Sequence, residues 1–184
     1  MKFIKLPDLH IAEEYWQISE NSPSGLIWIK SPAWGVKVGQ IAGSLDKYGY
    51  WDVALKGITY KAHRLVYLLK HKKDPGNLEI DHINGKADNE NLRTATRSQN
   101  QHNRPKRNMK TVSKYKGVIW SKQSNKWKAR IYVNKKCYWL GYFACEKAAA
   151  MAYNEAAVRL VGEFAVLNKI ENERDDGCCR LKRE

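Results

Sequence analysis

The clearest alternation of apolar and polar side chains lies in KWKARIYV (126–133). Successive side chains of a strand point to opposite faces of a sheet, so this segment predicts a strand with one basic and one apolar face. The residues NKK (134–136) predict a tight turn into the next strand. The Ala-rich run Glu146–Val161 predicts a helix, and Gly162 follows where a helix C-cap belongs. The pattern over 115–168 therefore predicts a three-stranded antiparallel sheet with one helix on its apolar face.

Shorter apolar runs separated by turn residues fill the first part of the chain. LIWIK (26–30) follows SPSG, and WDVAL (51–55) follows GSLDKYGY, so both are predicted to be short antiparallel strands. HRLVYLLKH (63–71) has apolar residues at helical spacing and predicts a helix that ends at DPGN.

The middle of the chain is more polar. The run LEI (78–80) predicts a strand, and Asn84-Gly85 is the signal of a hairpin turn. A short polar helix is expected after the hairpin, capped by Thr96 or Ser98 and running through residue 103.

These elements predict an α+β protein. Its N-terminal region is β-rich, its centre is a hairpin followed by a short helix, and its C-terminal part is a sheet packed on one helix. The predicted boundaries are 1–60 for the β-rich region, 61–104 for the central motif, 105–114 for a basic linker, 115–168 for the sheet-and-helix domain and 169–184 for a charged tail.

Charge is concentrated in one part of the chain. The sequence has 33 Lys and Arg against 19 Asp and Glu, a net charge of +14, yet residues 91–145 contain no Asp or Glu at all. A basic surface of this kind favours a polyanionic partner. No stretch approaches the ~18 apolar residues of a membrane span. The N-terminus has Pro, Asp and Glu where a signal peptide needs its apolar core, so we expect a cytoplasmic protein that is not secreted and has no membrane partner.

Candidate chemistry appears at Asp81 and His82. Amide side chains follow at Asn89, Asn91 and Asn100, and further amide and imidazole groups continue to residue 103. A hard divalent cation takes oxygen ligands from carboxylates and amides while it keeps several waters. A neutral histidine beside it takes the proton from an attacking water. This cluster therefore indicates metal-assisted hydrolysis.

Residues 62–104 resemble the HNH endonuclease family, whose fold is the ββα-metal motif. Asp81-His82 match the first signature pair, Asn91 in NLR matches the middle position, and Asn100 in SQN matches the final position. The resemblance implies that His82 is the general base and that Asn91 orients it. It also implies that Asp81 and Asn100 bind the metal, with Mg²⁺ expected and Mn²⁺ able to substitute.

Two assignments have alternatives at this stage. The final position is His in many relatives of the HNH family, so His102 or Asn103 are alternatives to Asn100 as the ligand. His63 precedes Arg64, and it either has a structural role at a strand-to-helix junction or contacts a phosphate.

Residues 115–168 resemble the AP2 domain, through YKGV, KWKARI, YWLGYF, the AAAMAYNEAA run and a closing LN. The resemblance implies a three-stranded sheet that enters the major groove of DNA, a known mode of β-sheet recognition. Trp127 is expected in the core, while the face of Trp139 is open because the strand phase is uncertain. The expected DNA contacts are Lys116, Trp120, Lys122, Lys126, Lys128, Arg130, Tyr132, Lys135, Lys136 and Trp139 in the domain, with Arg104, Lys106 and Arg107 in the linker.

Together these features predict a metal-dependent endonuclease of the homing type that cuts double-stranded DNA. Its build is that of phage or mobile-element nucleases, and a phage enzyme would act in the cytoplasm of a bacterial host cell. It carries one nuclease motif, so it is expected to be a monomer or a homodimer. The alternative is a DNA-binding regulator whose nuclease motif has decayed.

Overall fold

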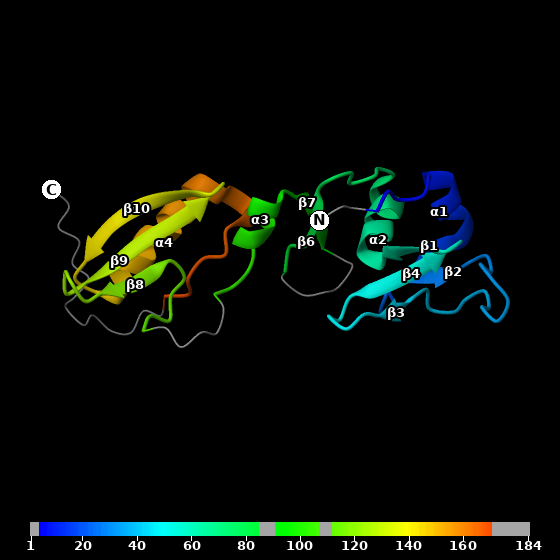
Figure 1. Ribbon diagram of the computed structural model, residues 1–184, viewed down its shortest axis with the longest axis horizontal. Coiled ribbons are helices and arrows are strands. Elements are labelled where there is room, and N and C mark those ends of the chain that lie inside the picture. The colour runs from blue at the N-terminus through cyan, green and yellow to red at the C-terminus, as the bar shows by residue number, and fades with distance from the viewer. Residues whose placement is uncertain (1–3, 85–90, 107–111, 171–184) are drawn as a thin grey trace. The chain divides into compact units, whose positions relative to one another are not determined.

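The computed structural model describes residues 4–84, 91–106 and 112–170, and the chain forms two compact units, Met1–Arg97 and Ser98–Glu184 (Figure 1). Both units contain helices and antiparallel strands, which confirms the α+β prediction. None of the helices in this described part is long and apolar enough to cross a membrane.

The first unit contains short strands and two helices in its described residues. Strand β1 pairs with β2, strands β3, β4 and β5 form a sheet in chain order, and β6 pairs with β7 as a hairpin. The strands predicted at LIWIK and WDVAL and the helix predicted at 63–71 are confirmed. The elements are α1 (Leu9–Tyr15), β1 (Trp16–Ile18), β2 (Leu26–Trp28), β3 (Ser44–Leu45), β4 (Trp51–Leu55), β5 (Ile58–Lys61), α2 (Ala62–His71), β6 (Glu79–His82) and β7 (Leu92–Ala95).

One hydrophobic core joins the elements of this unit. Trp16 of β1 and Val53 of β4 are fully buried, and the apolar stripe of α2 packs into the same core. The core extends to the β6–β7 hairpin through Ile80 and Leu92. Because burial of apolar surface is the main force that holds such elements together, the hairpin is anchored by its own apolar side chains.

The sequence pattern does not predict helix α1. It has only seven residues, and Ala12 and Tyr15 are its buried side chains. Helices this short are unstable in water by themselves. Tertiary packing on the common core therefore holds α1, and local periodicity over two turns is too weak a signal to show it.

The second unit is a three-stranded antiparallel sheet in the order β10-β9-β8, with a long helix across one face (Figure 1). This is the predicted sheet and helix, and α4 has the predicted bounds. The elements are α3 (Arg97–His102), which starts at the last residue of the first unit, β8 (Val118–Ser121), β9 (Lys126–Val133), β10 (Lys136–Phe143), α4 (Glu146–Val161) and the 3-10 turn η1 (Gly162–Phe164).

Small residues allow α4 to lie close to the sheet. Ala149 and Ala156 of the helix are buried, as are Ala129 and Ile131 of β9. The approach is tightest at Gly117, where a Cβ would lie 2.0 Å from Cδ2 of Tyr153. Gly117 also has φ +77°, a conformation that side chains disfavour. Any larger residue at this position would push the helix away from the sheet.

The predicted turn and helix end in this unit are confirmed. Asn134 and Lys135 both have positive φ, 49° and 66°, as a two-residue hairpin turn requires. Gly162 has φ +63° and its N–H donates to the carbonyl of Val158, which caps α4.

Candidate functional site

The β6–β7 hairpin brings together the residues predicted for the first and middle positions of the motif. Asp81 is opposite Arg93, and His82 is opposite Leu92. The N–H of Ile83 donates to the carbonyl of Asn91 at 2.9 Å, which closes the hairpin just beyond the strands. Asp81, His82 and Asn91 therefore lie within one small element, at the end from which the turn begins. Of the predicted turn residues, Gly85 lies outside the described part of the chain.

Asp81 is 3% exposed, and Nε of Arg93 donates to its Oδ2 at 2.9 Å. An ionised carboxylate this deeply buried is costly unless it is paired and hydrogen-bonded. Arg93 therefore balances the charge of Asp81 and fixes the orientation of its carboxyl group. Arg93 is not among the residues predicted from the sequence. Arg93 is the last residue of NLR, and the hairpin register sets it opposite Asp81. Knowledge of this register would have predicted the pair.

His82 is half-buried, and its ring contacts another imidazole. The ring centroids of His63 and His82 are 5.7 Å apart with an interplanar angle of 71°, and Tyr50 lies 5.8 Å from His63. Burial lowers the pKa of His63 to about 3, and the nearby charges of His82, Arg64 and Lys61 add to this effect. His63 is therefore uncharged at neutral pH.

The final position of the motif lies in the second unit, on helix α3. Asn100 and His102 belong to this helix. Asn103 follows it and donates its backbone N–H to the carbonyl of Gln99 at 3.2 Å. Burial lowers the pKa of His102, and the charge of Lys116 lowers it further.

Contacts from the sheet hold α3 within the second unit. Nζ of Lys116 donates to the carbonyls of His102 and Arg104, both at 2.8 Å. The N–H of Asn134 donates to Oγ of Ser98 at 3.2 Å. Burial lowers the pKa of Lys116 to about 8. The ammonium group of Lys116, predicted as a DNA contact, is thus half-buried and supports the end of α3.

The expected metal ligands carry oxygen donors. Across residues 4–84, 91–106 and 112–170, no three His, Cys, Asp or Glu side chains gather as they would around a metal ion. Asp81 and Asn100 instead offer a carboxylate and an amide oxygen. Such a donor set suits a hard cation that retains most of its waters.

The face of the second sheet that α4 leaves uncovered is basic and aromatic. Nζ of Lys128 lies 4.8 Å from the ring centroid of Trp139, and Cζ of Arg130 lies 5.2 Å from that of Tyr132. A register shift between Trp139 and Gly141 brings Tyr142 onto this face, edge-on to Trp139 at 4.9 Å. Cations over aromatic rings are held in place without losing their charge. We define the basic aromatic face as Lys126, Lys128, Arg130, Tyr132, Trp139 and Tyr142.

The strand register shows which face of the sheet carries Trp139, which the sequence left open, and Trp120, which the sequence predicted to contact DNA. Trp139 is 48% exposed and opposite Arg130, so it lies on the basic aromatic face. Trp120 is opposite Trp127, with ring centroids 5.0 Å apart, and both are half-buried. Directly opposite residues of paired strands lie on the same face of a sheet. Trp127 packs against the core under α4, so Trp120 also lies on the face that α4 covers and not on the exposed face. Tyr142 was missed because the register shift changes the strand phase.

The remaining predicted contacts lie in turns and in the linker. Lys122 and Lys135 are exposed in the two turns of the sheet, and Lys136 is exposed at the start of β10. Arg104 is also exposed. Nζ of Lys106 donates to the carbonyl of Ser113, and burial lowers its pKa. Arg107 lies outside the described residues.

Comparison with known proteins identifies one domain of the chain. Residues 60–102 match the family model described as HNH endonuclease. The chain therefore carries an HNH endonuclease domain at these residues. It is 36% identical over 131 residues to a protein of Acanthamoeba polyphaga mimivirus named as an uncharacterized HNH endonuclease, a match that covers 69% of this chain and 66% of that protein.

Shorter similarities connect the chain to plant proteins. It is 46% identical over 57 residues to a putative AP2/ERF and B3 domain-containing protein of Oryza sativa subsp. japonica, which covers 31% of this chain and 18% of that protein. It is 45% identical over 56 residues to an ethylene-responsive transcription factor of Arabidopsis thaliana, of which it covers 30%. No solved structure matches the chain.

Proposed function

We propose that this chain is a metal-dependent endonuclease of the homing type that hydrolyses phosphodiester bonds in double-stranded DNA. The observation that carries this proposal is the β6–β7 hairpin, which holds Asp81, His82 and Asn91 at one end of an HNH domain. His82 accepts a proton from the attacking water, which makes the water a stronger nucleophile. Asn91 orients His82 for this step.

Asp81 and Asn100 are the proposed ligands of a divalent ion, with Mg²⁺ expected and Mn²⁺ as a substitute. When bound, the ion supplies Lewis-acid stabilisation of the negative charge on the phosphate. Arg93 keeps the carboxylate of Asp81 in one orientation through the hydrogen bond from its Nε. Residues that orient a metal ligand in this way commonly change metal affinity when they are replaced.

The second unit is proposed to hold the DNA. Its basic aromatic face offers cations for phosphates and rings for sugars and bases. The AP2 names of the plant relatives support an AP2-like mode of binding by this sheet. With one nuclease motif, a monomer cuts one strand, and a homodimer is required for a double-strand break in a single event. Within the proposed domain boundaries, 115–168 is the AP2-like domain and 61–104 the nuclease motif.

A cleavage assay on supercoiled plasmid tests the proposal. The full chain should relax or linearise the plasmid with Mg²⁺ or Mn²⁺, and EDTA should stop the reaction because the hydrolysis depends on the ion. Mg²⁺ added in excess over EDTA should restore cleavage. Gel electrophoresis of the plasmid forms measures the extent of cleavage. A protein that binds the plasmid but never cuts it with any divalent ion would be the decayed regulator instead.

The identity of the ligand on α3 can be tested by two matched substitutions. Asn100→Ala should raise the Mg²⁺ concentration for half-maximal cleavage by about tenfold or more, because a ligand is lost. Asn103→Ala removes the same amide three residues later and should have a small effect. Cleavage rates over a Mg²⁺ titration measure both. The reverse order would make Asn103 the ligand.

A further inference from the structure

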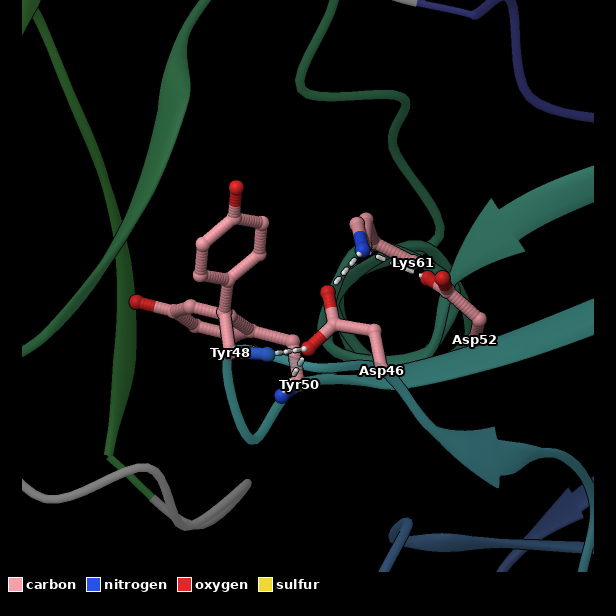
Figure 2. Close-up of polar contacts among 5 residues, drawn as sticks. All are labelled: Asp46, Tyr48, Tyr50, Asp52 and Lys61. Carbon is pink, nitrogen blue, oxygen red and sulfur yellow. Dashed lines mark hydrogen bonds and ion pairs between the residues drawn. The ribbon is translucent and has the colours of Figure 1, made fainter.

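The turn between β3 and β4, Asp46–Tyr50, is held in a fixed conformation by one carboxylate (Figure 2). Oδ1 of Asp46 accepts the backbone N–H groups of Tyr48 and Tyr50, each at 2.8 Å. The N–H of Asp46 in turn donates to the carbonyl of Tyr50 at 2.7 Å. Gly49, with φ +83°, allows the chain to reverse between the two tyrosines. We call residues 46–50 the tyrosine turn.

An ion pair fixes the other carboxylate oxygen of the same residue. Nζ of Lys61 lies 2.7 Å from Oδ2 of Asp46 and 2.7 Å from Oδ1 of Asp52 (Figure 2). The hydrogen bond from Lys61 and those from the backbone of Tyr50 and Tyr48 lower the pKa of Asp46 to about 2. The carboxylate is therefore ionised at any pH suited to a nuclease assay, and the support of the turn stays intact.

The rings on this turn contribute little to the core. Tyr48 is 73% exposed and Tyr50 is 42% exposed. In Figure 2 both side chains extend from the turn on the side opposite Asp52. Lys47 is exposed as well, and its Nζ lies 5.0 Å from the ring centroid of Tyr48. The fold thus fixes two aromatic rings and a cation at the surface.

His63 connects the tyrosine turn to the proposed general base within the same unit. The centroid of Tyr50 is 5.8 Å from that of His63, and the centroid of His63 is 5.7 Å from that of His82. Successive phosphates of one DNA strand advance by about 3.4 Å along the duplex. A phosphate at His82 therefore places Tyr50 within roughly three nucleotide steps of the cut.

We propose that the tyrosine turn is a substrate subsite for the nucleotides beside the scissile phosphate. Tyr48 and Tyr50 pack their rings against sugars and bases of this segment, and Lys47 binds one of its phosphates. The inference rests on the proposed endonuclease function, because it takes His82 as the position of the cut. It adds a DNA contact in the first unit, separate from the basic aromatic face of the second.

The test uses the full chain on the duplex that the wild type cuts, with its cut position mapped by sequencing. Tyr48→Ala and Tyr50→Ala should each raise the KM for cleavage severalfold, because each loses a contact of its ring with sugars and base edges of the duplex. Tyr50→Phe keeps the ring and should retain the wild-type KM. Trp34→Ala is the matched control, because Trp34 is a fully exposed aromatic residue in the loop between β2 and β3 of the same unit.

A second measurement locates the contact on the DNA. Duplexes that carry one uncharged methylphosphonate at each position within three nucleotides of the cut are bound in EDTA. Wild type should lose affinity at one of these positions, and Lys47→Ala should lose that sensitivity because the contact is already gone. Lys37→Ala removes the same charge from another exposed site in this unit and should retain the sensitivity.

The outcomes separate this inference from the proposed function. A wild type that never cuts with Mg²⁺ or Mn²⁺ contradicts the endonuclease itself. A wild type that cuts, with Tyr48→Ala and Tyr50→Ala showing the same KM as Trp34→Ala, overturns the subsite alone. A Lys47→Ala variant that keeps the wild-type sensitivity at every position overturns it too.

Discussion

His82→Ala should reduce the cleavage rate by about 10²- to 10⁴-fold, the usual contribution of a general base. Its affinity for duplex DNA in EDTA should stay within about twofold of wild type. The base acts on the proton of the attacking water in the transition state and adds little to binding of the ground state. Single-turnover cleavage and an equilibrium binding titration measure the two quantities.

His10→Ala is the matched control, since His10 is an exposed imidazole on α1 of the same unit. It should cut at the wild-type rate. A His82→Ala variant that also cuts at this rate would show that His82 is not the base, and the assignment of the hairpin would have to change.

Replacing Lys126, Lys128 and Arg130 together by Ala should weaken DNA binding strongly. Each phosphate contact contributes about −0.9 to the slope of log affinity against log salt. Loss of three contacts should therefore make the slope shallower by roughly 2.7 and lower affinity by more than about 100-fold at physiological salt. Binding titrations across a salt series measure both. At saturating DNA and low salt, the cleavage rate should stay near that of wild type.

Two further variants serve as controls for the triple substitution. Lys70, Lys72 and Lys73 lie at the end of α2, and their joint replacement by Ala removes the same net charge from the first unit. Lys116→Met removes a lysine whose ammonium group is bound to two backbone carbonyls. Neither should change the salt slope. If the triple substitution on the sheet also leaves the slope unchanged, the basic aromatic face does not bind DNA.

The strands and the long helix of the second unit could be predicted from the sequence, because alternation and capping act between neighbouring residues. The alternation in KWKARIYV decided which side chains of β9 are buried, because a strand turns each successive side chain to the other face. The bounds of α4 followed from its run of alanines and from Gly162, whose positive φ suits a helix end. These signals depend on neighbours in the chain and need no partner from elsewhere.

The arrangement of the central motif, residues 61–104, could be predicted only in part from the sequence. The cluster of carboxylate, imidazole and amide groups indicated metal-assisted hydrolysis. The resemblance to the HNH family then proposed Asp81, His82, Asn91 and Asn100 as its residues. The hairpin register that sets Arg93 against Asp81 depends on how two strands pair that are nine residues apart in the chain. The contact of His63 with His82 joins a helix to a strand almost twenty residues later, and no local pattern encodes it.

The sequence by itself thus determined the class of chemistry, the helices and strands with strong periodicity, and the basic character of residues 91–145. Tertiary structure decided which polar groups meet. It turned Trp120 toward Trp127 and brought Tyr142 to the exposed face through a shift in register. It bound the ammonium group of Lys116 to the end of α3, and it placed the tyrosine turn beside His63. The physical reason is that periodicity and capping act within a few residues, whereas burial and pairing join side chains that only the folded chain brings together.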